Sequence, residues 1–315
     1  MILEVGLLIS GLVVLAFASD KTIDIASRLA ATANIPPLLI GIVVLSMGTS
    51  LPEISNSLVS TISGHPEINV GNIFGSSLSQ ITLIFGLAVL IAGPMVLGRR
   101  DVLLLGGCAI MGAMLSLFAV ESGEITLINA VFLIASYFIL IFISNKYSVK
   151  RYVAPEGVEA KKFWPRKERI IGFGKLLFFL IGIGAGATIV VESTVTISYA
   201  LGIPSYLVSF FGIAIGTSLP ELFVAVSALK KGQDELAVGN IMGSNITDST
   251  LALAVGPLVA PSILPEAGLA IATGIYLVFS SMVVVALFAW RRKLDRFAAM
   301  VLLGLYAASY LFFFA

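Results

Sequence analysis

The chain of 315 residues has few of the charged side chains that a water-soluble protein places at its surface. Only 12% of its residues are charged and 58% are hydrophobic, whereas an ordinary soluble domain carries about 25% charged residues. Because so apolar a chain cannot cover a surface exposed to water, we expect the lipid bilayer to be its solvent. The formal net charge of +1 argues against a nucleic-acid partner.

Histidine and cysteine are nearly absent, with one of each. His65 lies in a Gly-His-Pro-Glu turn and is interpreted as a solvated loop residue, with a peripheral pH or metal role as the alternative. Cys108 lies in an apolar run, cannot form an intrachain disulfide, and is interpreted as a small core residue. An intramembrane enzyme would need a nucleophile–base pair or a histidine-rich metal site, and no ATP-binding motif is present. We therefore expect neither an enzyme nor a primary pump, and no resident cofactor.

Long apolar runs, in contrast, are abundant. A membrane span needs about 20 mainly apolar residues, and this rule predicts an all-α integral membrane protein with ten transmembrane helices. A polar stretch, 145–169, is interpreted as a linker between a first unit, 1–144, and a second unit, 170–315, of one integrated transport domain. The predicted spans are approximately 3–19, 35–62, 68–93, 101–120, 125–144, 170–191, 204–229, 236–258, 265–290 and 297–315.

Basic residues fall on one side of this topology. All 19 Lys and Arg residues lie in odd-numbered loops, in the central stretch 145–169, or at Lys175 near the start of the sixth helix. Because basic loops stay in the cytoplasm, we predict a multi-pass protein of the cell membrane with both termini outside and a cytoplasmic central loop. That loop is expected to set topology and contact anionic headgroups, with a regulatory role as the alternative. Asp20, Asp24 and Glu192, at helix ends, are interpreted as solvated or lysine-paired acids.

The chain also contains an internal repeat. Gly-Thr-Ser-Leu-Pro-Glu at 48–53 recurs at 216–221, and Gly-Asn-x-x-Gly-Ser at 71–76 recurs at 239–244, both with an offset of 168. An Ile-Pro pair upstream recurs at the same offset. Since a unit of five helices has an odd number of spans, the second copy must be inverted in the membrane. Inverted repeats with a site near the midplane are a transporter architecture.

Two prolines and three acids point to a cation site. Pro52 and Pro220 should break their helices and release carbonyls one turn earlier, which is tolerated in a membrane only where the backbone is buried or lines a cavity. Glu53, Glu221 and Asp248 are the acids predicted to lie deep in the membrane, where each costs at least ~2.5–3.5 kcal/mol if ionised. Inversion would bring the two glutamates together, and a divalent cation between them would remove their repulsion. Structural, hydrogen-bonded carboxyls are the alternative.

Further polar residues align with this site. Helical spacing places polar groups on one face of each of the helices that follow the two motifs. Carbonyls, hydroxyls and carboxylates together form a set of hard oxygen ligands, which suits calcium or sodium. The aligned residues are Asn72, Ser76 and Gln80 in the first copy and Asn240, Ser244 and Asp248 in the second.

The paired motifs closely resemble the two alpha-repeats of the calcium/cation antiporter superfamily, specifically its sodium/calcium exchanger branch of prokaryotic type. The resemblance covers the whole chain and implies exchange of sodium for calcium by alternating access. It implies that Glu53 and Glu221 bind calcium, assisted by the carbonyls of Thr49 and Thr217. It further implies a sodium-binding set that consists of Ser46, Thr49, Ser50, Glu53, Ser76, Gln80, Ala214, Thr217, Ser218, Glu221, Ser244 and Asp248.

One position departs from the family pattern. The first-repeat partner of Asp248 is usually Asn in sodium/calcium exchangers and is Gln80 here, which keeps the amide and adds one methylene. The proton-coupled branch more typically has Gly-Asn in place of the first Gly-Thr-Ser, yet proton-coupled or potassium-dependent cation antiport stays an alternative. A channel would instead need a continuous pore. The expected partners are calcium and sodium ions and the lipid bilayer, with no obligate protein partner evident.

Overall fold

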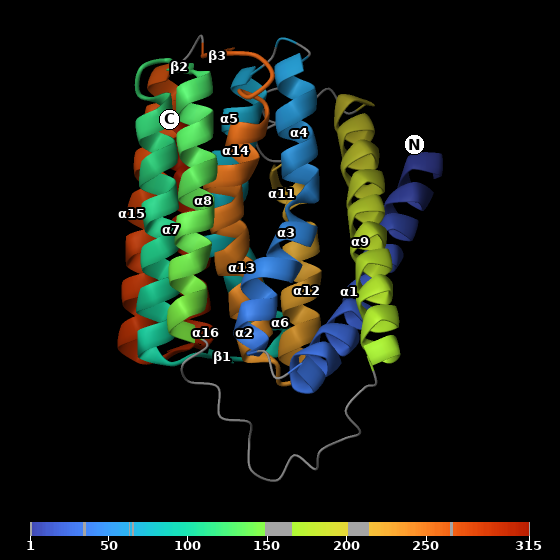
Figure 1. Ribbon diagram of the computed structural model, residues 1–315. Helices are drawn as coiled ribbons and strands as arrows, with labels where there is room; N and C mark the ends of the chain where they lie inside the picture. Colours follow the sequence, from blue (N-terminus) through green and yellow to red (C-terminus); the bar gives the residue numbers. More distant parts are fainter. Residues whose placement is uncertain are drawn as a thin grey trace.

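The computed structural model describes residues 2–33, 36–62, 64, 66–148, 166–200, 214–264 and 267–314. The fold is an all-α membrane protein whose helices run side by side in one bundle (Figure 1). The elements of the first half are α1 Ile2–Ala33, α2 Pro37–Ile40, η1 Gly41–Leu45, α3 Ser46–Thr49, α4 Leu51–Ile62, α5 Pro66–Ser79, η2 Gln80–Ile84, α6 Phe85–Ala92, β1 Met95–Val96, α7 Arg99–Val120, β2 Glu124–Ile125 and α8 Leu127–Ser148.

The second half follows the same order of helices and short strands. Its described elements are α9 Arg166–Ala200, α11 Ala214–Thr217, α12 Leu219–Lys230, α13 Asp234–Thr247, η5 Asp248–Ala252, α14 Leu253–Val255, β3 Ser262–Ile263, α15 Ala267–Arg291, β4 Lys293–Leu294 and α16 Arg296–Phe314. The segments named η are single turns of π-helix inside longer helices. Such turns are rare and often occur at functional sites.

Within the described ranges, four uninterrupted helical segments are long and apolar enough to cross a membrane, and a bent pair makes a fifth. The four segments are Pro66–Ala92, Arg99–Val120, Leu127–Asn145 and Ala267–Arg291. The bent pair joins Pro37–Thr49 to Leu51–Ile62 at an angle of 42°. These segments correspond to five of the ten predicted spans.

Large apolar side chains lie on the outside of the bundle and many polar side chains lie in its interior, as a lipid environment requires. Large apolar side chains such as Ile128, Phe178 and Trp290 are exposed on the outside of the bundle. Helices α5 and α13, in contrast, are buried over most of their length although they carry many serine and asparagine residues. In lipid, a buried polar interior marks a functional region.

The helices form three groups (Figure 1). Helices α7, α8, α15 and α16 form one flank of the bundle, and α1 packs along α9 on the opposite flank. The short helices α2 to α6 and α11 to α14 lie between them. The start of α1 and the end of α16 lie at one end of the bundle, whereas the end of α8 and the start of α9 lie at the other.

Element bounds recur along the chain with the offset of the sequence repeat. Adding 168 to the bounds of α3, α4, α5 and η2 reproduces the bounds of α11, α12, α13 and η5. The strands follow the same relation approximately, because β1 corresponds to β3 and β2 to β4. Strand β1 pairs antiparallel with β4 at one end of the bundle and β2 pairs with β3 at the other (Figure 1).

The first helix is longer than predicted. Its predicted span ends at residue 19, but α1 continues to Ala33. The prediction was wrong because Asp20, Lys21 and Asp24 mark a polar segment, whereas Thr22, Ile23 and Ala26 stay buried on one helical face. The helix therefore continues as an amphipathic segment. Helices α8 and α9 also extend a few residues into the stretch 145–169.

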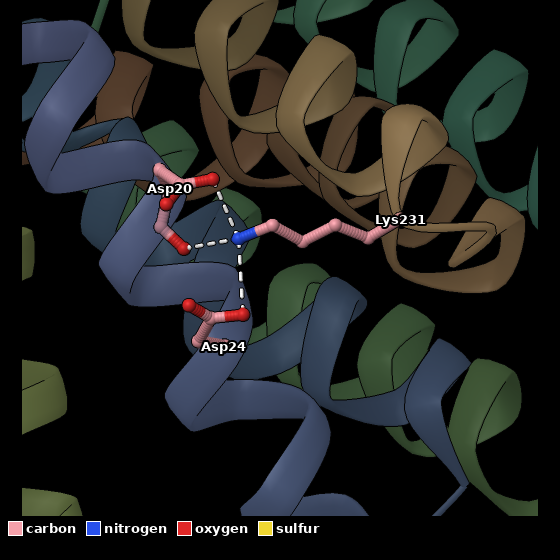
Figure 2. Close-up of polar contacts among 3 residues, drawn as sticks. All are labelled: Asp20, Asp24 and Lys231. Carbon is pink, nitrogen blue, oxygen red and sulfur yellow. Dashed lines mark hydrogen bonds and ion pairs between the residues drawn. The ribbon is translucent and has the colours of Figure 1, made fainter.

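Lys231, at the end of α12, forms ion pairs with this amphipathic part of α1 (Figure 2). Its Nζ lies 2.6 Å from Asp20 Oδ1 and 3.0 Å from Asp24 Oδ1, and it donates a hydrogen bond of 2.8 Å to the Asp20 carbonyl. These three contacts match the three donors of an ammonium group. The interpretation of Asp20 and Asp24 as lysine-paired acids is confirmed, whereas the Glu192 side chain, His65 and residues 149–165 lie outside the described residues.

Candidate ion-binding site

Both repeated motifs sit at a helix break. Helix α3 ends at Thr49 and α4 begins at Leu51, while α11 ends at Thr217 and α12 begins at Leu219. Pro52 and Pro220 occupy the second position of the new helix, where a missing N–H costs no intrahelical hydrogen bond. The predicted breaks are confirmed, and they place the ends of two helices in the interior of the bundle.

Each break positions an acid. Glu53 and Glu221 lie in the first turn of α4 and α12, where the positive end of the helix dipole favours a negative charge. The preceding short helices end on the same two breaks, and the carbonyls at a helix end favour a cation. Each break therefore combines an anchored carboxylate with cation-attracting carbonyls.

Thr49 reaches into the second half of the chain. Its Oγ1 lies 3.2 Å from Asn240 Oδ1 and 3.2 Å from Ser244 Oγ, both on α13. Its hydroxyl also lies 3.3 Å from the Ser46 carbonyl of its own helix. One break in the first half thus faces the polar stripe of the second half.

Thr217 repeats this arrangement with the halves exchanged. Its Oγ1 lies 3.1 Å from Ser76 Oγ and 3.4 Å from Asn72 Oδ1, both on α5. It also lies 3.3 Å from the Ala214 carbonyl. Because each residue here is the 168-offset equivalent of one at Thr49, the two breaks face each other through matching sets of contacts.

Three carboxylates are fully buried beside these hydroxyls. Glu53, Glu221 and Asp248 have no exposed surface, and they are close enough to interact electrostatically with one another. Both oxygens of Glu53 and one oxygen of each other acid have no hydrogen-bond partner among the described residues. Glu221 Oε1 accepts a hydrogen bond of 3.1 Å from Ser244 Oγ.

A buried carboxylate needs compensation, because an isolated ionised carboxylate in a low-dielectric interior is very costly. Among the described residues, Lys231, Arg291 and Lys293 form ion pairs with Asp20, Asp24 and Asp295, away from the three buried acids. No group of three or more His, Cys, Asp and Glu side chains in those same residues is arranged to hold a metal ion alone. The oxygen set is therefore mixed and combines carboxylates with hydroxyls and backbone carbonyls, as hard cations require.

The remaining residues of the predicted set lie around the same breaks. Ser46 and Ala214 are the residues whose carbonyls accept the backbone N–H of Ser50 and Ser218, at 2.9 and 3.3 Å. Each carbonyl also lies 3.3 Å from the hydroxyl of the threonine three residues later, so carbonyl and hydroxyl oxygens meet at each break. The Ser50 hydroxyl has no partner among the described residues. All members of the set are buried: Ser46, Thr49, Ser50, Glu53, Asn72, Ser76, Gln80, Ala214, Thr217, Ser218, Glu221, Asn240, Ser244 and Asp248.

Gln80 and Asp248, which occupy equivalent repeat positions, contact each other. Gln80 Nε2 donates a hydrogen bond of 2.7 Å to Asp248 Oδ2. Each is the first residue of a π-helical turn, η2 or η5. Two equivalent residues can meet directly only near the line where the halves face each other, so this pair marks the centre of the junction.

Two polar residues of the site were missed by the sequence reasoning. Ser79 Oγ lies 3.0 Å from Ser218 Oγ, and Asn245 Nδ2 donates a hydrogen bond of 2.9 Å to Gln80 Oε1. Ser79 lies three residues after Ser76, and Asn245 directly follows Ser244. A wider polar face on the two central helices was the signal that would have found them.

Comparison with known proteins identifies relatives along the whole chain. The profile of the family described as sodium/calcium exchanger protein matches residues 3–146 and 171–315. The inner membrane protein YrbG of Escherichia coli is 30% identical over 303 residues, which cover 93% of this chain and 90% of YrbG. The sodium/calcium exchanger MaX1 of Methanosarcina acetivorans is 28% identical, and the match covers 96% of each chain.

A solved structure shares the fold. The sodium-calcium exchanger NCX_Mj, in crystals soaked with 2.5 mM Na⁺ and 1 mM Sr²⁺, superposes with a TM-score of 0.79. It is 29% identical, and the match covers 98% of both chains. The sodium/calcium exchangers among these matches are transporters and not enzymes. The chain therefore belongs to the sodium/calcium exchanger family and is a membrane cation antiporter.

Proposed function

We propose that this protein exchanges sodium for calcium across the cell membrane by alternating access, with both ions bound at one site around Glu53 and Glu221. The observation that carries the proposal is the group of three buried carboxylates at the junction of two similar halves, with four carboxylate oxygens that have no hydrogen-bond partner among the described residues. A bound cation would supply the missing positive charge. Membership of the sodium/calcium exchanger family supports the choice of ions.

The proposed architecture has ten transmembrane helices in two inverted repeats. Residues 1–144 and 170–315 would form the repeats, and 145–169 would link them. The recurrence of helix bounds at an offset of 168 supports this division, as does the family profile matching 3–146 and 171–315. The exchange of strand partners between the two ends of the bundle is what inversion would produce. In such transporters the ions bind where the repeats meet.

For calcium, we propose bidentate binding by Glu53 and Glu221, completed by the carbonyls of Thr49 and Thr217. Calcium takes six to eight oxygen ligands, and this set offers four carboxylate oxygens and two carbonyls. The hydroxyls of both threonines already contact the opposite half. Those contacts would hold the two carbonyls toward each other.

For sodium, we propose the same two acids with the neighbouring hydroxyls, the carbonyls of Ser46 and Ala214, and Asp248. Because calcium and sodium would use the same carboxylates, each ion would exclude the other, and exclusion is the requirement for exchange. One calcium ion would leave one of the three acids uncompensated, whereas three sodium ions would compensate all of them. The sodium set comprises Ser46, Thr49, Ser50, Glu53, Ser76, Gln80, Ala214, Thr217, Ser218, Glu221, Ser244 and Asp248.

The proposed orientation places both termini outside the cell. The starts of α7 and α9 and the ends of α12 and α15 carry basic residues, and basic segments stay in the cytoplasm. The start of α1 and the end of α16 lie at the opposite end of the bundle (Figure 1). This arrangement supports a cytoplasmic central loop.

The experiment is calcium uptake into sodium-loaded proteoliposomes that contain the purified protein. An outward sodium gradient should drive radioactive calcium inward, and Glu53→Gln or Glu221→Gln should abolish uptake. Glu121→Gln is the matched control, because Glu121 is an exposed glutamate at the end of α7. Uptake that follows a proton gradient and ignores sodium would replace the proposal with proton-coupled antiport. An additional requirement for potassium would indicate the potassium-dependent alternative.

A further inference from the structure

The amide of Gln80 is held between two side chains of the second half. Its nitrogen donates to Asp248 Oδ2 at 2.7 Å, and its oxygen accepts from Asn245 Nδ2 at 2.9 Å. Asn245 Nδ2 also donates to the Ile241 carbonyl at 3.1 Å. All three polar side chains are buried. The hydrogen bonds therefore run in one direction, from Asn245 through Gln80 to Asp248.

This direction depends on Asn245. A primary amide has one donor end and one acceptor end. If the Gln80 amide turned over, its oxygen would face the Asp248 carboxylate and its nitrogen would face the Asn245 nitrogen, so both contacts would be repulsive. The Ile241 carbonyl holds the Asn245 amide in its present orientation. Asn245 thereby selects the orientation in which Gln80 is a donor toward the site.

The arrangement exists on one side of the junction only. The repeat equivalent of Asn245 is Ser77, whose hydroxyl has no hydrogen-bond partner among the described residues. The equivalent of Asp248 is Gln80 itself. The pair of Gln80 and Asp248 is therefore asymmetric in two respects. Only Asp248 can carry a negative charge, and the residue that hydrogen-bonds to the Gln80 oxygen, Asn245, comes from the second half.

We infer that Asn245 is a positioning residue that, through Gln80, occupies Oδ2 of Asp248 and leaves Oδ1 to bind sodium. The inference rests on the proposed sodium/calcium exchange and deepens it. Toward Asp248, Gln80 then acts as a hydrogen-bond donor, while its oxygen accepts a hydrogen bond from Asn245. Asp248 Oδ1 has no hydrogen-bond partner among the described residues, so one anionic oxygen remains for a cation.

Sodium and calcium should respond differently to the loss of this support. In the proposed site, calcium is bound by Glu53 and Glu221 with two carbonyls, and Asp248 belongs to the sodium set alone. Disturbing Asp248 should therefore weaken sodium binding more than calcium binding. A residue with a merely structural role would change both affinities, or the yield of folded protein, together.

The test compares Asn245→Leu with the unaltered protein in proteoliposomes. Leucine has a similar size but no amide. We expect the sodium concentration for half-maximal exchange to rise about tenfold, equivalent to about 1.4 kcal/mol. The calcium concentration for half-saturation should change by less than about twofold, since the variant removes an interaction that calcium does not use. Ser77→Ala, at the equivalent position of the first half, is the matched control and should leave both values unchanged.

A double-mutant cycle tests whether Asn245 acts through Gln80. In a Gln80→Leu background there is no amide to orient, so Asn245→Leu should add less than about twofold to the change in sodium affinity. Asn245→Asp is a second variant in case the leucine variant fails to fold. Its carboxylate would attract the Gln80 nitrogen and turn the Gln80 oxygen toward Asp248, so sodium affinity should again fall.

The inference is overturned if the folded variants bind sodium as the unaltered protein does, if both ion affinities fall together, or if the two substitutions are additive. Exchange in the unaltered protein separates this failure from that of the proposed function. If the unaltered protein shows no sodium-coupled calcium flux, the proposed function is wrong and this inference is wrong with it. If it exchanges normally and the variants do too, only the inference is wrong.

Discussion

A single methyl group added at Gly243 should disturb both the packing of the two halves and the site. A Cβ at Gly243 would lie 2.7 Å from the Ile42 carbonyl oxygen and 2.8 Å from both Ile42 Cα and Ser46 Cβ. The first distance is about 0.7 Å short of the 3.4 Å at which ordinary contact begins. Because the obstructing atoms include backbone, Gly243→Ala must push α13 away from η1.

The same displacement acts on the contacts of the site. Ser244 directly follows Gly243, and Thr49 lies at the end of the helix that carries Ser46. Moving these helices apart by about 0.7 Å would lengthen the Thr49–Ser244 contact from 3.2 Å to about 3.9 Å, which is no longer a hydrogen bond. Overpacking of this kind typically costs about 1–3 kcal/mol. We therefore expect a lower unfolding temperature and weaker calcium binding.

The assay is thermal unfolding in detergent, followed by tryptophan fluorescence, together with calcium half-saturation in proteoliposomes. Gly243→Ala should lower the apparent unfolding temperature by several degrees, since 1 kcal/mol corresponds to roughly 2–4 °C in a domain of 150–250 residues. Gly107→Ala is the matched control, because Gly107 is exposed on α7 and no described atom lies within 4 Å of its Cβ position. Alanine is the better helix former by about 0.5–1 kcal/mol, so this control should be neutral or stabilising. The prediction is refuted if Gly243→Ala has the same unfolding temperature and calcium half-saturation as Gly107→Ala.

Three further predictions concern other contacts. Lys231→Met removes the ion pairs with Asp20 and Asp24 and should lower the apparent unfolding temperature in detergent by a few degrees. Each exposed ion pair contributes about 0.2–1 kcal/mol. Lys230→Met, at the exposed neighbouring position, should leave the unfolding temperature unchanged. Thr217→Val keeps the shape and the carbonyl but removes the hydroxyl contacts with α5, so calcium half-saturation in uptake assays should rise about twofold to tenfold, as expected for about 0.5–1.5 kcal/mol; an unchanged value would contradict the role of that hydroxyl. Arg291 hydrogen-bonds Asp295 and lowers the pKa of that carboxyl, so the ion pair stabilises the protein above the unfolded pKa of about 3.9 and is lost as pH falls through the lowered folded pKa. Asp295→Asn should therefore reduce the unfolding temperature at pH 7, and in melts at decreasing pH the difference should shrink below about pH 4.

The location of the site follows from the sequence because its chemistry is local. Pro52 and Pro220 determine the helix breaks through the missing N–H, and Glu53 and Glu221 lie one residue later. A fixed offset between the two motifs then relates the two breaks. None of these steps requires knowledge of the tertiary packing.

Contacts between the halves depend on packing that the sequence does not specify. The π-helical turns at Gln80 and Asp248 insert an extra residue, so the 3.6-residue spacing used to align the polar stripe does not predict which groups face each other beyond them. Asn245 was missed because the predicted stripe followed the four-residue spacing of Asn240, Ser244 and Asp248, and Asn245 lies outside that spacing. The length of α1 was missed because burial of its small apolar face against other helices, including α12, outweighs its charged residues.

The central claim is that sodium and calcium compete for one site built on Glu53 and Glu221. Equilibrium binding of radioactive calcium to the purified protein, titrated with sodium, tests it most directly. The account predicts that sodium raises the apparent calcium dissociation constant without changing the number of calcium ions bound at saturation, and that Glu53→Gln and Glu221→Gln each remove the calcium binding. Calcium binding that is indifferent to sodium, or that survives in both variants, would contradict the claim.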